Sequence, residues 1–276
     1  MEQITRRKFL KLGLAGSVLL VSYPFMVERY LIQLNHYRVY LKNLPAGFQG
    51  FRIAHLTDIH YGSLTPLWLV EHVVAMANRQ AANIIVCTGD YVHERDSIQQ
   101  IDEVWPVLSK LTAPQGVFSV LGNHDHWAST SQSLKWLEHS NQNLRHRAVR
   151  IDQGNDHIWL GGCGDLWEDE LGVDLAFSSA PPQDFKIMLA HNPDTTDRSF
   201  NTRLDLILSG HTHGGQVAIP FVGAPIVPVQ NKNYTSGFFQ TNNGTLFISR
   251  GIGWTILPVR FNCPPEIAVL ELVNTA

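Results

Sequence analysis

Five short apolar runs along the chain each end directly before a polar loop. The runs lie at residues 51–54, 84–87, 117–121, 187–189 and 204–208. Apolar runs of this length, bounded by polar residues, predict buried strands that end where the polarity changes. Since ligands of α/β sheets bind outside the carboxyl ends of the strands, the pattern predicts one site where five strand ends meet.

The segments around these runs predict further strands and three helices. Additional strands are expected at residues 32–44, 146–151, 157–161, 246–249 and 266–272, the last as an outer strand because it alternates and is partly polar. Helices are expected from Pro66, with Thr65 as the cap, at residues 98–111 with a break at Pro106, and at residues 133–139. The periodicity by itself supports an α/β fold.

The five polar loops contain residue types that bind metal ions. They read Asp58-Ile59-His60, Gly89-Asp90, Gly122-Asn123-His124-Asp125, His191-Asn192-Pro193-Asp194 and Gly210-His211-Thr212-His213. In an extended segment, alternation would direct both side chains of Asp-x-His and of His-x-His to the same side. Carboxylate, amide and imidazole groups without cysteine favour manganese, iron or zinc in a hydrolytic site.

These motifs, in this order from residue 58 to residue 213, resemble the signature of the calcineurin-like metallophosphoesterases. Residues 210–216 and the tail from residue 248 to residue 267 resemble a membrane-associated bacterial branch of that family. The resemblance implies a two-sheet β-sandwich flanked by helices, and two divalent or transition metal ions. It implies that one metal is held by Asp58, His60, Asp90 and His213, and the other by Asp90, Asn123, His191 and His211, with Asp90 as the bridge.

The resemblance also implies hydrolysis of a phosphoester with His124 as the general acid. Two metal ions about 3.5–4 Å apart would activate the attacking water and neutralise charge on the phosphoryl oxygens. His124 would protonate the leaving oxygen, and the adjacent Asp125 would fix the tautomer of the imidazole. We therefore predict His124 and Asp125 as catalytic residues. Of the other histidines, only His93 and His126 are close enough in sequence to be expected near the site.

The N-terminus predicts export by the twin-arginine (Tat) pathway. Residues 5–11 read Thr-Arg-Arg-Lys-Phe-Leu-Lys, and residues 12–27 carry no charge. A helix of sixteen residues reaches about 24 Å, which is short for a membrane span and suits a signal segment. Because bulky residues occupy the place of a cleavage site, we expect an uncleaved anchor. Residues 1–30 are therefore the signal or anchor segment, and residues 31–276 form one metallophosphoesterase domain.

The composition is that of a globular protein and does not indicate binding to nucleic acid. Hydrophobic residues make up 44% of the 276 residues, charged residues 16%, and the formal net charge is −3. Residues 1–11 hold four of the basic residues and one acidic residue, so the remaining chain has a net charge of −6. Such a mildly acidic body offers no basic surface to a nucleic acid. Three widely spaced cysteines predict no disulfide framework.

These features favour a dinuclear-metal-dependent phosphodiesterase or pyrophosphohydrolase at the outer face of the bacterial cytoplasmic membrane. Its partners would be a phosphoester substrate, lipid-linked in one version of the hypothesis, the membrane through the N-terminal segment, and the Tat translocase during export. Two alternatives stay open. One is a UDP-diacylglucosamine pyrophosphohydrolase of lipid A synthesis, and the other is an envelope binding protein that keeps the fold without catalysis.

Overall fold

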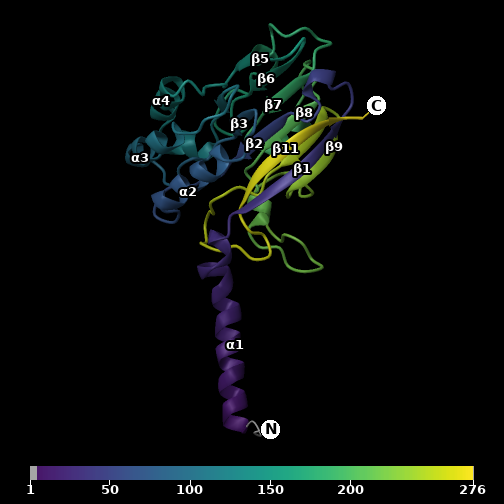
Figure 1. Cartoon of the computed structure of the whole chain (residues 1–276). Coiled ribbons are helices and arrows are strands. Elements are labelled where there is room, and N and C mark those ends of the chain that lie inside the picture. Colours follow the sequence, from purple (N-terminus) through teal and green to yellow (C-terminus); the bar gives the residue numbers. More distant parts are fainter. Residues whose placement is uncertain (1–4, 276) are drawn as a thin grey trace.

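The computed structural model describes residues 5–275 and shows two β-sheets packed face to face, with the longer helices of the domain against one of them (Figure 1). Apolar side chains of both sheets meet between them, among them Ile53 and Leu270 from one sheet and Leu160 and Leu206 from the other. Removing these side chains from water is the main force that holds the sheets together. The expected α/β sandwich with flanking helices is confirmed.

The first sheet is mixed and has five strands in the order β1, β11, β2, β3, β4. Their bounds are Gln33–Leu41 for β1, Glu266–Asn274 for β11, Arg52–Leu56 for β2, Ile84–Cys87 for β3 and Val117–Ser119 for β4. Strands β2, β3 and β4 are parallel, whereas β11 pairs antiparallel with β2 and parallel with β1. The carboxyl ends of β2, β3 and β4 therefore lie at one edge, next to the start of β1.

The second sheet is also mixed and has six strands in the order β5, β6, β7, β8, β10, β9. Their bounds are Arg147–Gln153 for β5, Asp156–Gly162 for β6, Lys186–Leu189 for β7, Leu206–Ser209 for β8, Gly244–Ile248 for β10 and Gly237–Thr241 for β9. The four central strands run parallel, and each edge strand pairs antiparallel with its neighbour. Strands β7 and β8 thus end together, as the sequence pattern requires.

Helices α2 (Leu67–Asn78), α3 (Ile98–Leu108) and α4 (Asn123–His139) cover the outer face of the first sheet. The short helix α5 (Val173–Ala176) and buried side chains of residues 227–234 cover the outer face of the second sheet. Short 3-10 turns lie at Glu28–Tyr30, Ala46–Phe48, Pro193–Asp197 and His213–Gly215. Both faces of the sandwich are therefore shielded from water.

Several local predictions were wrong. Helix α3 does not break at Pro106, because the proline lies in its last turns and the Ser109 N–H still donates to the Trp105 carbonyl oxygen at 2.8 Å. Helix α4 is interrupted at Ser129, whose backbone is extended, and the helix predicted at residues 133–139 lies in the part after this kink, whereas the part from Asn123 was not predicted. Thr65 caps no helix, since Pro66 is the N-cap of α2. Strand β11 is not an outer strand but lies between β1 and β2. Its polar residue Glu266 is buried because Arg250 pairs with it at 2.9 Å.

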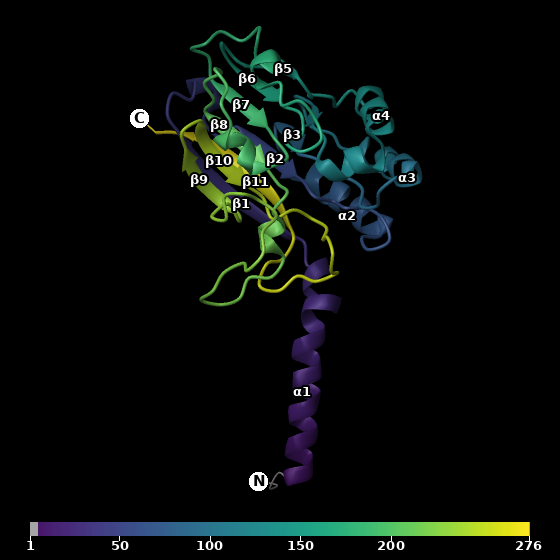
Figure 2. The same ribbon diagram turned by 180° about the vertical axis from the view of Figure 1, so that it is seen from behind.

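Helix α1 (Arg6–Met26) projects away from the sandwich, as the two opposite views show (Figures 1 and 2). Thr5 caps it by accepting a hydrogen bond from the Lys8 N–H. Its last turns contact the domain, where the Arg260 N–H donates to the Pro24 carbonyl oxygen at 3.1 Å. No helix within residues 5–275 is long and apolar enough to cross a membrane. The predicted boundary at residue 30 stays a prediction, and residues 1–4 lie outside the described part.

Candidate metal centre and its surroundings

All seven predicted metal ligands come together at the strand ends. Asp58 and His60 follow β2, Asp90 follows β3, Asn123 follows β4, His191 follows β7, and His211 and His213 follow β8. Every one of these side chains is buried, and the two sheets supply them jointly. Buried polar groups in such number need partners or bound cations, because their desolvation is costly.

The backbone that presents these ligands is left-handed, not extended as we expected from the alternating motifs. Asp58, His60, Asp90, His211 and His213 all have φ between 50° and 70°. Non-glycine residues adopt this conformation at an energetic cost, and such positions cluster at functional sites. The paired side chains therefore meet because the chain turns sharply after each strand.

Glycines of the motifs allow the strand-end loops to approach one another. A Cβ atom on Gly122 would overlap the Asp90 carboxylate, and one on Gly210 would overlap the side chains of Thr57 and Asp58. At Gly89, which has φ of 97°, a Cβ would overlap the backbone of Gly122. These glycines are required by close approach, so the loops of different strands can share one small volume.

The first cluster contains Asp58, His60 and His213. The Nε2 atoms of the two histidines lie 3.1 Å apart, and Asp58 Oδ1 lies 3.3 Å from His213 Nε2 and 3.9 Å from His60 Nε2. The three candidate ligand atoms all lie within 4.8 Å of one another. This cluster matches three of the four ligands predicted for the first metal.

The second cluster contains Asp90, His191 and His211. His191 Nε2 lies 3.2 Å from Asp90 Oδ2 and 3.1 Å from His211 Nδ1. The same Asp90 oxygen lies 3.4 Å from His60 Nε2, which belongs to the first cluster. Asp90 is therefore the carboxylate common to both clusters, in the position of the predicted bridge.

Hydrogen bonds to the outer ring nitrogens orient two of the histidines. His191 Nδ1 donates to the Thr88 carbonyl oxygen at 2.7 Å, and His211 Nε2 donates to the Pro228 carbonyl oxygen at 3.0 Å. In each ring the other nitrogen then faces the cluster. Such outer hydrogen bonds are the usual way in which proteins orient histidine ligands of metals.

Burial and charge set the protonation of the site. Burial lowers the pKa of His60, His211 and His213, to about 3 for His211, so these imidazoles are neutral. Burial alone would raise the pKa of Asp90, but the imidazoles of His191 and His124 hold it well below its usual range. In turn the Asp90 carboxylate overcomes burial and raises the pKa of His191 to about 10. A cation bound between Asp90 and His191 would therefore displace a proton.

The donor set fits two hard or borderline metal ions. It consists of imidazoles, carboxylates and the amide of Asn123, whose Oδ1 is buried without a hydrogen-bond partner among the described residues. An orphaned buried acceptor is rare unless an ion or water satisfies it. The residues present are thus suited to manganese, iron or zinc, as predicted from the residue types.

Comparison with known proteins identifies the family to which the chain belongs. The sequence profile described as calcineurin-like phosphoesterase matches residues 51–215, which contain all seven ligand candidates. The chain belongs to this family. An uncharacterised metallophosphoesterase of Bacillus subtilis, YkuE, is 32% identical over the whole of both chains. The phosphodiesterase YaeI of Escherichia coli is 31% identical over 98% of this chain and all of the relative. A more distant relative is the UDP-2,3-diacylglucosamine pyrophosphatase LpxG of Chlamydia muridarum, 23% identical over 93% of this chain and 94% of its own.

His124 lies at the border of the phosphoesterase site and is half-buried. Its Nδ1 donates to the His93 carbonyl oxygen at 2.7 Å, and its ring lies 4.6 Å from the ring of His60. The ring of His93 stacks on it at 5.5 Å, and one ring nitrogen of each forms a third cluster with His60. The position of His124 beside both clusters is consistent with the predicted acid.

The carboxylate of Asp125 does not hydrogen-bond to the imidazole of His124, contrary to our expectation. Its Oδ2 accepts from the N–H groups of Asp90 at 2.8 Å and Gly122 at 2.9 Å, and its Oδ1 accepts from the Tyr91 N–H at 2.8 Å. The tautomer of His124 is fixed by the His93 carbonyl oxygen instead. Asp125 is therefore a positioning residue that ties the loop after β3 to the loop after β4.

Two tryptophans lie at the rim of the site. The ring of Trp127 lies 4.6 Å from that of His124 and carries the Arg95 guanidinium 3.9 Å above it. Trp167 is exposed, and its ring lies 4.5 Å from the ring of His211. Trp127 could have been found, because it lies three residues after His124 on the helix that begins at Asn123. Trp167 comes from a distant loop, and no local pattern predicts its contact.

Two arginines and a tryptophan of the C-terminal segment have structural roles. Arg250 pairs with Glu266, and Trp254 is fully buried. Arg260 is buried and donates to the carbonyl oxygens of Gly253 and, at 2.9 Å, of His213. Residues 220–243, which follow the loop that carries His211 and His213, are in part core, since Val227, Val229 and Tyr234 are buried and β9 lies within them.

We predict that Asp125→Asn lowers activity equally for good and poor leaving groups. Asparagine keeps one acceptor oxygen but places an NH₂ group against a backbone N–H, which should also cost about 1–3 kcal/mol of unfolding free energy. The measurement is turnover of two diesters that differ only in leaving group, together with urea unfolding. A loss confined to the poor leaving group would instead show that Asp125 acts in proton transfer.

Proposed function

We propose that the chain is a two-metal phosphodiesterase or pyrophosphohydrolase. The observation that carries this proposal is the pair of clusters, Asp58–His60–His213 and Asp90–His191–His211, which share Asp90. Asn123 completes the second set. A decayed site would be expected to lack a ligand or His124, and this chain has all of them, which argues against a non-catalytic binding protein.

The residues around the clusters each have a defined part in the proposed reaction. When bound, manganese, iron or zinc would activate water and neutralise charge on the phosphoryl oxygens. His124 holds its Nδ1 proton on the His93 carbonyl oxygen, so its Nε2 is the atom that gives a proton to the leaving oxygen. Trp127 and Trp167 flank the two sides of the site and would contact the groups esterified to the phosphate.

The phosphodiesterase assignment is supported by similarity to YaeI, whose name states that activity. The similarity to LpxG supports a second candidate, hydrolysis of UDP-diacylglucosamine. UDP-sugars are found in the cytoplasm, so this candidate conflicts with the export signal proposed next. An assay panel of phosphomonoesters, diesters and pyrophosphates separates these candidates.

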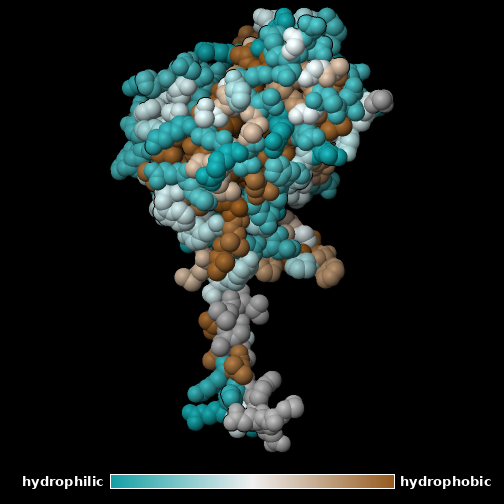
Figure 3. Space-filling view, in the orientation of Figure 1, coloured by the Kyte–Doolittle hydropathy of each residue, from teal (hydrophilic) through white to brown (hydrophobic). Residues whose placement is uncertain are grey.

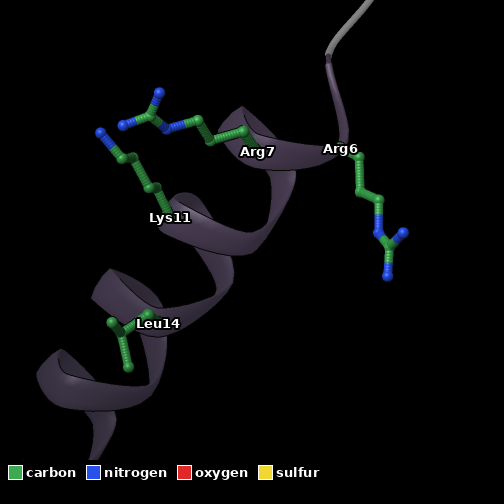
Figure 4. Close-up of a pocket in the computed structure, with 4 residues that line it drawn as sticks. All are labelled: Arg6, Arg7, Lys11 and Leu14. Atoms are coloured by element: carbon green, nitrogen blue, oxygen red, sulfur yellow. The ribbon is translucent and has the colours of Figure 1, made fainter.

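The proposed place of action is the outer face of the cytoplasmic membrane after export by the Tat translocase, with α1 as the anchor. Arg6 and Arg7 lie in the first turn of α1, and Figure 4 shows Arg7 and Lys11 extending on one side and Arg6 on the other. The twin-arginine pair is thus presented on an exposed helix whose remaining charge is basic. Residues 12–27 then offer no charge to the membrane.

The function is tested on the purified full-length chain loaded with Mn²⁺. We expect about two metal ions per chain and hydrolysis of bis(p-nitrophenyl) phosphate that is lost on chelation and restored by Mn²⁺. Asp90→Asn should remove both metals together, whereas His139→Gln, a change at an exposed histidine of α4, should remove neither. One metal or fewer per chain, with no diesterase activity, would contradict the proposal.

His124→Ala is expected to keep the metals and lose the acid. The turnover of a diester with an alcohol leaving group should fall about 10²–10⁴-fold, whereas bis(p-nitrophenyl) phosphate should lose much less, because p-nitrophenolate scarcely needs a proton. Steady-state kinetics on both diesters, with the metal content of each preparation, provide the measurement. Equal losses on the two diesters would remove His124 from this role.

Replacing Arg6 and Arg7 together by lysine should keep the protein inside the cell, because the pathway reads the arginine pair and not only its charge. Lys11→Arg is the matched control and should leave export unchanged. Cell fractionation with protease access to intact spheroplasts gives the location and the length of the exported form. Continued export of the double-lysine variant would exclude the twin-arginine pathway, and a shortened periplasmic form would exclude the anchor.

A further inference from the structure

Exposed apolar side chains of the domain concentrate in two loops at the end that carries α1. We call residues 217–227 and 252–261 the apolar loop pair. Phe221 is fully exposed, Ile256 is 86% exposed, Ile226 75% and Val222 71%, and Ile219, Leu257 and Phe261 add to the same set. Residues 214–231 and 251–259 contain no charged side chain. Apolar side chains gathered in this way mark an interaction surface.

Hydrogen bonds join the two loops into one surface. The Ala218 N–H donates to the Phe261 carbonyl oxygen at 2.8 Å, and the Phe261 N–H donates to the Gln216 carbonyl oxygen at 2.9 Å. The Gln216 side chain bonds both backbone groups of Thr255, at 2.6 and 3.0 Å. These hydrogen bonds fix the bases of both loops, and the exposed tips project from this common base.

The same surface is attached to the end of α1. The Cys263 N–H donates to Glu28 Oε1 at 2.8 Å, and the Arg29 guanidinium lies 4.8 Å from the centroid of the Trp254 ring. The Tyr30 ring contacts both Trp254 and the exposed Trp68, at 5.6 and 5.8 Å. The loop pair thus borders the point where α1 leaves the domain (Figures 1 and 2).

Apolar surface continues from the loop pair onto α1. Val18, Val21 and Met26 are exposed on the helix, and the basic residues Arg6, Arg7, Lys8 and Lys11 stand at its far end. In the space-filling view, brown and tan atoms surround the base of the helix, whereas most of the body above is teal (Figure 3). Tyr30, Arg29 and Trp68, at the level of this base, are residue types that favour the polar boundary of a bilayer.

The candidate metal centre lies at this end of the molecule. Strand β1 starts beside the start of β11, and β2, which runs antiparallel to β11, ends there before Asp58. The loop pair also contacts the ligand loops, because Pro228, directly after it, accepts from His211, and Arg260 donates to the His213 carbonyl oxygen. A partner surface that binds the apolar loop pair would therefore also set the direction in which the metal centre faces.

We propose that the apolar loop pair inserts its tips into a lipid bilayer beside α1 and turns the metal centre toward the membrane surface. A bilayer is the partner that can receive both the loop tips and the uncharged part of α1 at once, whereas a second copy of the chain would have to cover a projecting helix as well. Insertion of the tips requires no spanning helix. This inference rests on the proposed function. The substrate class that the orientation serves is a phosphodiester or pyrophosphate in a lipid headgroup.

Depth measurements on full-length protein test the surface directly. Cysteine is placed at position 221, at position 256 or, as the control, at the exposed Tyr40, near the far end of β1, and labelled with an environment-sensitive fluorophore. The native Cys87, Cys163 and Cys263 are buried, so the label reports the introduced site. On phosphatidylglycerol and phosphatidylethanolamine vesicles, labels at 221 and 256 should shift to the blue and be quenched by nitroxide lipids, and the label at 40 should do neither.

The same labels distinguish the alternatives. If positions 221 and 256 are quenched no more than position 40, the proposal is wrong. A blue shift at 221 that occurs without vesicles and grows with protein concentration, together with crosslinking between two copies at 221, would assign the surface to a dimer and also overturn it.

An activity assay tests the orientation. Phe221→Ser with Ile256→Ser should leave the hydrolysis of soluble bis(p-nitrophenyl) phosphate unchanged, which also shows that the fold is intact. Hydrolysis of phosphatidyl-p-nitrophenol in vesicles, which releases the same product, should fall at least about tenfold. Tyr40→Ser should change neither. Equal rates of the double variant and wild type on vesicles would contradict the orientation, whereas failure of wild type on both diesters would instead contradict the proposed function.

Discussion

The structure depends on the buried carboxylate of Asp90, which lies between two groups of ligands. Each group draws its side chains from both sheets. Asp90 lies within 3.4 Å of imidazoles that follow β2 and β7, and its own N–H is held by Asp125. A buried carboxylate is stable only with compensating charge or hydrogen bonds, so the loops around it must meet with little freedom. This requirement explains the left-handed backbone at five ligands and the glycines that allow the loops to touch.

Much of the fold could be predicted because strands in this chain are short apolar runs that end abruptly in polar motifs. The strands that carry ligands were predicted within a few residues, and family resemblance supplied the two-sheet arrangement. The error at β11 arose because tertiary contacts override local pattern. Glu266 looks polar in sequence, yet Arg250, Asn35 and Tyr37 pair with it and allow β11 to lie inside a sheet.

At the site, too, features set by a short motif could be predicted, and features set by contacts between distant segments could not. Ligand identity could be inferred from motifs, because each motif is local and chemically specific. The role of Asp125 could not, because adjacency in sequence to His124 does not imply contact once a helix begins at Asn123 and the carboxylate points back to the loop after β3. Arg260, which looks like a phosphate ligand, is instead buried and supports the loop that carries His213.

Crystallography of the Mn²⁺-loaded protein at a wavelength where manganese scatters anomalously is the most direct test of the central claim. The account predicts two anomalous peaks about 3.5–4 Å apart, one beside Asp58, His60 and His213 and the other beside Asn123, His191 and His211, with Asp90 between them. A single peak, or two peaks that do not share Asp90, would contradict it.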